Sequence, residues 1–157
     1  MRAEGEPVAE LVDVWQIICP QCGAINRVPA RRLGEQPRCG KCGAFLFVGK
    51  PADLSEAAFD RHLQRDSRPL LVDFWAAWCG PCRAMAPAFA AAAAVLEPGV
   101  RLGKVDTEAE QTLAARHAIR SIPTMILFRQ GRELARTSGA MDQAGIVRWV
   151  RQALDRG

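Results

Sequence analysis

Residues 70–82 read Leu-Leu-Val-Asp-Phe-Trp-Ala-Ala-Trp-Cys-Gly-Pro-Cys, and this stretch decides the fold. Its first seven residues form an almost continuous apolar run of strand length, which is typical of a strand covered on both faces of a sheet. The two cysteines, Cys79 and Cys82, follow directly. An alanine-rich stretch of strong helix formers then runs to about residue 96, with Pro81 suited to the first helical turn. The sequence therefore predicts a buried strand that leads through a dithiol motif into a helix.

The segments around this unit alternate between helical and strand periodicity. Pro87 falls inside the alanine-rich helix, where we expect it to cause a kink. Together the segments predict an α/β fold, a mixed central sheet flanked by helices on both faces. The further predicted segments are helices over 54–63, 108–116 and 146–154, a strand over 100–105, and a hairpin of strands over 124–128 and 133–137.

The cysteine content divides the chain into two parts. Four of the six cysteines lie in the first fifty residues. A segment of this length forms too small a hydrophobic core to fold without an additional cross-link such as a bound metal. We expect a small domain over residues 1–50 and a domain of ordinary size over 51–157. Residues 51–53 are the expected junction.

The small domain carries the pattern C-x2-C-x16-C-x2-C, formed by Cys19, Cys22, Cys39 and Cys42. This spacing is typical of four-thiolate zinc sites, in which two tight turns supply tetrahedral sulfur ligands with no open position. The pattern predicts one structural Zn²⁺ in a four-cysteine zinc ribbon. Iron and a pair of disulfides are the alternatives.

The third cysteine pair predicts redox chemistry. A thiol at a helix N-terminus faces unpaired backbone amides, which stabilise its thiolate. We expect Cys79 to lie at the exposed tip and attack a substrate disulfide, and Cys82 to be shielded and resolve the mixed disulfide. A half-site for a metal is the alternative for this pair. Asp73, inside the apolar strand, is predicted to have a pKa raised by burial and to take a proton from Cys82; a solvent-facing Asp73 is the alternative.

Composition limits the partners and the compartment. The chain has 157 residues, of which 49% are apolar, and a net charge of +4, which is too small to indicate a nucleic-acid or membrane partner. Residues 1–7 are acidic and unlike a secretory signal, and no apolar stretch reaches the roughly 18 residues of a membrane span. Cysteine pairs in such a chain indicate metal or redox chemistry. We expect a cytoplasmic protein.

The chain closely resembles the thioredoxin family in three motifs. These are Trp75-Ala76-Ala77-Trp78-Cys79-Gly80-Pro81-Cys82, the preceding Val72-Asp73-Phe74, and Ile122-Pro123-Thr124 much later in the sequence. With the N-terminal cysteine pairs added, the whole chain resembles the zinc-ribbon branch of that family, thioredoxin 2. The resemblance implies a thioredoxin fold and a protein-disulfide reductase. It also implies disulfide-containing proteins as substrates, an NADPH-dependent thioredoxin reductase as electron source, and a monomer.

The resemblance also assigns residues. It implies that the Lys104 ammonium approaches the Asp73 carboxylate, with a solvent-exposed Lys104 as the alternative, and that Pro123 follows a cis peptide bond. The cis bond would present the backbone of Ile122 to an extended substrate peptide. A flat apolar docking patch would then comprise Trp78, Gly80, Pro81, Ile122, Gly139 and Ala140.

Two further hypotheses come from other functional classes. One is a zinc-ribbon adaptor whose second domain only binds partners. The other is a redox sensor in which oxidation of the zinc thiolates ejects the metal. His62 and His117 lie on predicted helices away from the cysteine pairs, and we expect them to be surface or packing residues.

Overall fold

The computed structural model describes residues 13–157, so the interpretation of residues 1–7 concerns residues outside the described range. Residues 13–50, here called the ribbon, contain a two-stranded antiparallel sheet of β1 (Val14–Ile18) and β2 (Ile25–Pro29). A 3-10 turn, η1 (Ala30–Arg32), follows, and an isolated bridge joins Arg38 to Phe45. A small core of aliphatic side chains and the buried cysteines Cys19 and Cys39 fills this part.

Residues 51–157, here called the body, form a five-stranded sheet in the order β3-β5-β4-β6-β7. β3, β5 and β4 run parallel, whereas β6 is antiparallel to β4 and β7 is antiparallel to β6. This arrangement confirms the predicted mixed sheet. The elements are β3 (Ala52–Asp53), α2 (Glu56–Arg65), β4 (Leu70–Trp75), α3 (Gly80–Leu96), β5 (Arg101–Asp106), α4 (Gln111–Arg116), β6 (Thr124–Arg129), β7 (Arg132–Ser138) and α5 (Gln143–Arg156).

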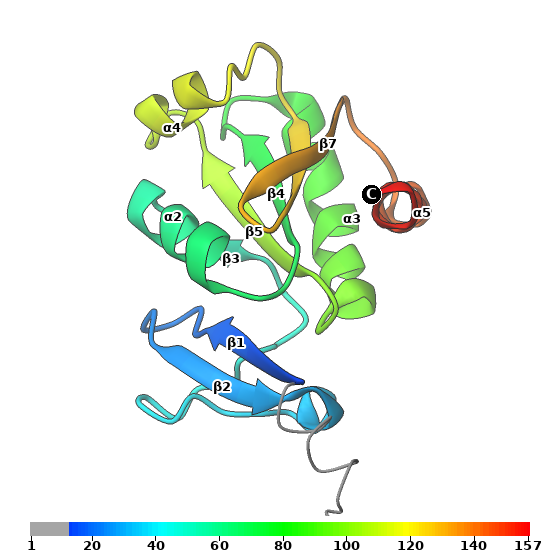
Figure 1. The fold of residues 1–157 in the computed structure, drawn as a ribbon. Helices are drawn as coiled ribbons and strands as arrows, with labels where there is room; N and C mark the ends of the chain where they lie inside the picture. The colour runs from blue at the N-terminus through cyan, green and yellow to red at the C-terminus, as the bar shows by residue number, and fades with distance from the viewer. Residues whose placement is uncertain (1–12) are drawn as a thin grey trace, which may run out of the picture.

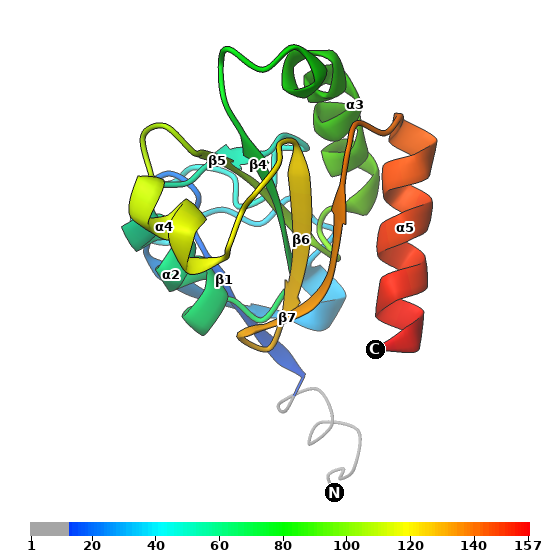
Figure 2. The same cartoon turned by 90° about the horizontal axis from the view of Figure 1, so that it is seen from above.

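Helices cover both faces of this sheet, with α3 and α5 on one side and α2 and α4 on the other (Figures 1 and 2). β4 lies in the middle, and its side chains alternate between the two cores. Leu71 belongs to the core beneath α3 and α5, whereas Val72 and Phe74 belong to the core beneath α2. The strand is therefore buried on both faces, as its apolar run predicted.

Several boundaries differ from the sequence-based expectation. The helix expected from residue 108 begins at Gln111, because the Asp106 carboxylate accepts the amides of Glu108 and Ala109 and holds residues 107–109 in a turn. By contrast, α3 contains Pro87 and ends at Leu96, as the sequence predicted. The expected junction at residues 51–53 contains the short strand β3, which pairs with β5.

The ribbon packs against the end of the sheet where β4 and β5 begin, on the side of α2 and β3 (Figure 1). Cys79 and Cys82 follow the other end of β4, so the two cysteine sites lie at opposite ends of the sheet. In the described part of the chain, no helix is both long and apolar enough to cross a membrane.

Close packing of β5 against the segment after β3 gives a testable prediction. A methyl group added at Gly103 would clash with the Leu54 side chain, which is itself buried in the core beneath α2. Gly103→Ala is expected to lower the free energy of unfolding by about 1–3 kcal/mol through overpacking. Gly34→Ala is the matched control: a methyl group there meets no atom within 4 Å, so this variant should be neutral or slightly stabilising. Urea unfolding of both variants measures this, and equal stabilities would contradict the predicted packing.

Candidate active site and metal centre

Cys79 and Cys82 are joined by a disulfide at the start of α3, with their Cα atoms 5.2 Å apart. Cys79 occupies the N-cap position, and its Sγ accepts the backbone N–H of Cys82 at 3.1 Å. Pro81 lies in the first turn, as predicted. The structure therefore shows the oxidised form of the pair, with Cys79 sulfur at the amide end of the helix.

Cys79 is less accessible than the sequence suggested. Its side chain is 4% exposed, so the expectation of an exposed tip is wrong for this oxidised form. Trp75 and Ile122 pack against the cysteine pair, and Cys79 Sγ lies 3.8 Å from the carbonyl oxygen of Ile122. Cys82 is buried at 2% exposure, which confirms that it is shielded.

A surface hollow of about 430 Å³ opens beside Cys79. Five of its lining residues were predicted: Trp78, Cys79, Gly80, Pro81 and Ile122. Thr107, Ala114, Ile119 and Arg120 also line it and were missed, because they come from loop and helix positions with no motif to mark them. Trp78 is 67% exposed, and its indole N–H donates to a Glu108 carboxylate oxygen at 3.3 Å.

The Ile122–Pro123 peptide bond is cis, which confirms this part of the resemblance. The carbonyl oxygen of Pro123 accepts the N–H of Gly139 at 2.9 Å, which places residue 139 beside the proline. Gly139 and Ala140 are exposed and do not line the hollow. The six residues of the docking patch are therefore divided between the hollow and the neighbouring end of β7.

Asp73 lies on the same face of β4 as Leu71, toward α3, and is 1% exposed. Burial raises the pKa of Asp73 to about 7, although the charge of Lys104 opposes this shift. Lys104 lies opposite Asp73 in the β4–β5 register, and its ammonium lies 4.5 Å from the centre of the Trp75 ring. The alternative of a solvent-facing Asp73 is excluded.

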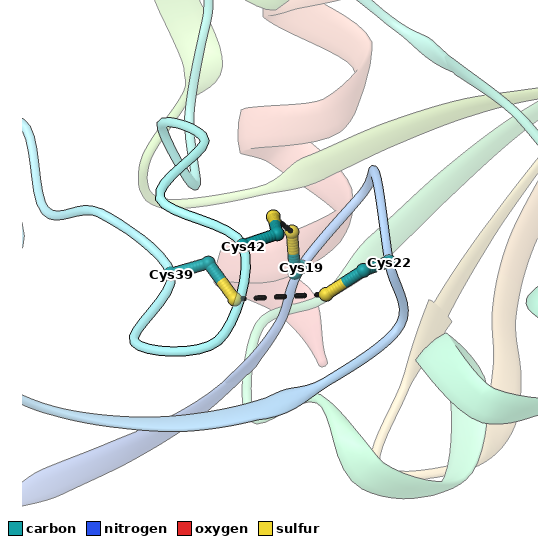
Figure 3. A group of neighbouring side chains, drawn as sticks. All are labelled: Cys19, Cys22, Cys39 and Cys42. Atoms are coloured by element: carbon teal, nitrogen blue, oxygen red, sulfur yellow. Dashed lines mark hydrogen bonds between the residues drawn. The ribbon is translucent and has the colours of Figure 1, made fainter.

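The four ribbon cysteines come together, with all their sulfur atoms within 4.8 Å of one another (Figure 3). Sγ of Cys19 lies 3.7 Å from that of Cys42, and Sγ of Cys22 lies 3.7 Å from that of Cys39. These separations are too long for disulfides, whose sulfurs are about 2.05 Å apart. They match a tetrahedral metal site, since four bonds of about 2.3 Å place the sulfurs about 3.8 Å apart.

The two turns that carry these cysteines each contain a glycine with a positive φ. Gly23 and Gly43 have φ values of +77° and +80°, where a side chain would be strained. Backbone amides point at sulfur: Cys39 Sγ accepts the N–H of Lys41 at 3.3 Å. Amides, first that of Cys42, together with the Asn26 side chain, lower the pKa of Cys39 to about 6. A thiolate there is well suited to a cation.

The fourth thiol shows why the cluster needs a positive charge. The Ala44 amide lowers the pKa of Cys42, but burial and the other three thiols outweigh it and raise that pKa to about 11. Four thiolates within such short distances repel one another unless a cation offsets part of their charge. The donor set, its spacing and its electrostatics thus all fit a metal site.

Comparisons with known proteins agree with both sites. The thioredoxin profile matches residues 50–152, and the profile described as "Thioredoxin 2, N-terminal" matches residues 18–44. The chain belongs to the thioredoxin family. Thioredoxin C-3 of Corynebacterium nephridii is 42% identical over 140 residues, which cover 89% of this chain and 96% of that protein.

Two other thioredoxins show the extent of the match. That of Porphyra purpurea is 37% identical over 59% of this chain and 87% of its own length. A solved thioredoxin variant from Halobacterium salinarum superimposes with a TM-score of 0.62 at 25% identity, covering 68% of this chain and 93% of that one. The thioredoxin fold and the Cys79–Cys82 disulfide make this chain a thiol–disulfide oxidoreductase of the protein-disulfide reductase type.

The two histidines of this thioredoxin are packing residues. His62 is buried, and its Nδ1 lies 3.0 Å from the carbonyl oxygen of Ala58. The His117 ring packs edge-on against Phe59 and Phe128 with ring centres 5.3 Å apart. Neither belongs to the four-cysteine cluster.

The burial of Asp73 predicts an unusual pH dependence of stability. Because its pKa is near 7 in the folded chain and near 4 when unfolded, the folded state binds more protons between these values. Stability is therefore lost as the pH rises from about 4 through 7. Asp73→Asn should be more stable than wild type by about 2–4 kcal/mol at pH 8, and this gain should vanish near pH 4.

Chemical denaturation from pH 4 to pH 8 measures this difference. Asp53→Asn, at an exposed carboxylate on β3, is the control and should show no comparable gain. Stability curves of wild type and Asp73→Asn that run parallel over the whole range would refute the assignment.

Proposed function

We propose that this thioredoxin is a cytoplasmic protein-disulfide reductase that cycles between the Cys79/Cys82 dithiol and the disulfide seen in the structure. The observation that carries the proposal is a disulfide at the N-terminus of α3 whose Cys79 sulfur borders an apolar hollow beside the cis Ile122–Pro123 bond. Such a hollow admits an extended peptide segment around a substrate cystine.

The reaction transfers two electrons in two exchange steps. The Cys79 thiolate attacks one sulfur of the substrate disulfide, forms a mixed disulfide and releases the other substrate sulfur as a thiolate. Cys82 then loses its proton and attacks the Cys79 sulfur, which releases the second substrate sulfur. The substrate leaves as a dithiol and the enzyme as the disulfide.

Asp73 is proposed to accept the proton of Cys82 in the second step. A carboxylate with a pKa of about 7 exchanges protons readily at neutral pH, and Asp73 faces the helix that carries Cys82. Lys104 is proposed to favour the ionised carboxylate from the neighbouring strand. Its charge opposes the effect of burial on the Asp73 pKa.

Substrate docking is proposed on Trp78, Gly80, Pro81, Ile122, Gly139 and Ala140. Trp78 supplies the largest exposed apolar surface among them, and Pro123 fixes the backbone direction of residue 122. We propose that the chain acts as a monomer without nucleic acid. Its electrons would come from NADPH through a thioredoxin reductase. A relative from Mycobacterium leprae, named bifunctional thioredoxin reductase/thioredoxin, supports that pairing; it is 35% identical over 64% of this chain and 22% of its own length.

The four-cysteine cluster is proposed to hold one structural Zn²⁺. Cys19, Cys22, Cys39 and Cys42 supply four sulfur ligands with tetrahedral spacing, which leaves no position for a substrate. A bound ion would offset two of the four negative charges of these thiolates, and the four cysteines would hold it between the two turns. Iron in the same cage is the alternative that metal analysis distinguishes.

Substitutions of the two catalytic cysteines should block the reaction at different steps. Cys79→Ser removes the attacking sulfur, so insulin-disulfide reduction with dithiothreitol should fall to the uncatalysed rate. Cys82→Ser leaves the attack intact but prevents resolution, so a covalent mixed disulfide with the substrate should accumulate. Gel electrophoresis under non-reducing conditions detects it. Unchanged turnover after Cys79→Ser would refute the role of the nucleophile.

Metal content and thiol reactivity test the second site. The purified, reduced chain should contain one equivalent of zinc and show two thiols that react with a chromogenic disulfide reagent. A chelator in excess should release the zinc and expose four more thiols. Six reactive thiols before chelation, or iron in place of zinc, would contradict the proposal.

A further inference from the structure

Arg101, the first residue of β5, is buried at 2% exposure where the body meets the ribbon. Its guanidinium donates through Nη1 to the carbonyl oxygen of Leu46 at 2.9 Å and through Nη2 to that of Ile18 at 3.1 Å. Ile18 directly precedes Cys19, and Leu46 lies four residues after Cys42. One side chain of the body thus binds the backbone just before the first cysteine pair and four residues after the second.

Glu97 completes this buried contact from the end of α3. One of its oxygens lies 3.6 Å from Arg101 Nη1, and the other accepts the backbone N–H of Gly49 at 2.9 Å. The ring of Phe47 lies 4.5 Å from the guanidinium carbon. Both charged groups are therefore bound to each other and to the ribbon. A buried ion pair of this kind tolerates the loss of a partner poorly, because the remaining charge stays out of water.

The turn of Cys19 and Cys22 is held by the body on both sides. The N–H of Ile18 donates to an Asp66 carboxylate oxygen at 3.0 Å, so both backbone groups of Ile18 are bound by side chains of the body. On the far side of the turn, Arg61 donates to the carbonyl oxygen of Gly23. The body thus fixes the backbone immediately before Cys19 and immediately after Cys22.

We propose that Arg101, held by Glu97, is a positioning residue of the metal site and links metal retention by the ribbon to the folding of the body. Removal of a group that orients metal ligands without contacting the metal commonly changes the metal affinity 10–100-fold. The link is reciprocal: if the folded body helps the ribbon keep its metal, the bound metal stabilises the body by the same free energy. This inference rests on the proposal that the cysteines hold zinc.

Zinc binding by full-length variants tests the link. Arg101→Met keeps the aliphatic stem and removes both donors to the ribbon. Because that change leaves Glu97 charged and buried, the double variant Glu97→Gln with Arg101→Met is the decisive one. Arg101→Lys keeps the charge but cannot donate to both carbonyls in the same way. Arg136→Met is the matched control, since Arg136 pairs with Glu133 and binds the carbonyl of His117, within the body.

Two measurements are made on each variant. Competition with a chromogenic zinc chelator gives the zinc dissociation constant, and hydrogen–deuterium exchange follows the amides of β5 with and without zinc. We expect the double variant and Arg101→Lys to bind zinc at least tenfold more weakly than wild type and Arg136→Met. Zinc removal should accelerate amide exchange in β5 of wild type. In the double variant it should change the exchange rate of these amides little.

The outcomes separate this inference from the function on which it rests. If wild type binds no zinc, the proposed metal is refuted and the inference falls with it. If wild type binds zinc and the double variant retains it equally well, only the inference is overturned. Unchanged β5 exchange on zinc removal from wild type would also overturn it.

Discussion

The burial of β4 on both faces is the constraint on which the rest of the structure depends. Because α2 and α3 cover opposite faces of this strand, its end is fixed relative to both cores, and Cys79 is delivered to the first turn of α3. The same burial keeps water from Asp73 and raises its pKa to about 7. One packing arrangement therefore positions the sulfur that reacts and the carboxylate that is proposed to serve it.

Much of the body could be predicted because its signals are local. The apolar run of β4, the alanine-rich helix and the turn between β6 and β7 each depend on neighbours in the chain. Cys19, Cys22, Cys39 and Cys42 were found by spacing alone, since two short turns need few other residues. The predicted exposure of Cys79 was wrong because part of its cover is distant in the chain: Trp75 is a near neighbour, but Ile122 lies forty-three positions further along.

The contact between ribbon and body could not be predicted from the sequence for a related reason. Arg101 at the start of a strand and Glu97 at the end of a helix look like ordinary surface charges, and no local pattern marks a buried arginine. Only the fold brings Ile18 and Leu46 to the same guanidinium. Likewise Arg120, which lines the hollow beside Cys79, reaches it because the loop before β6 returns past the start of α3.

The same two-residue spacing supports two chemistries in this chain, and backbone conformation decides between them. In the ribbon, the amide two residues after the first cysteine donates to its sulfur, as that of Gln21 does to Cys19 at 3.4 Å. Contacts of 3.7 Å join sulfurs of opposite turns, Cys19 with Cys42 and Cys22 with Cys39, which suits a shared cation. At Cys79 the chain enters helix α3 directly, and the Cys82 amide of its first turn donates to the Cys79 sulfur. There the paired sulfurs are bonded to each other as a disulfide, whereas the ribbon sulfurs of opposite turns face a shared site that is proposed to hold a metal.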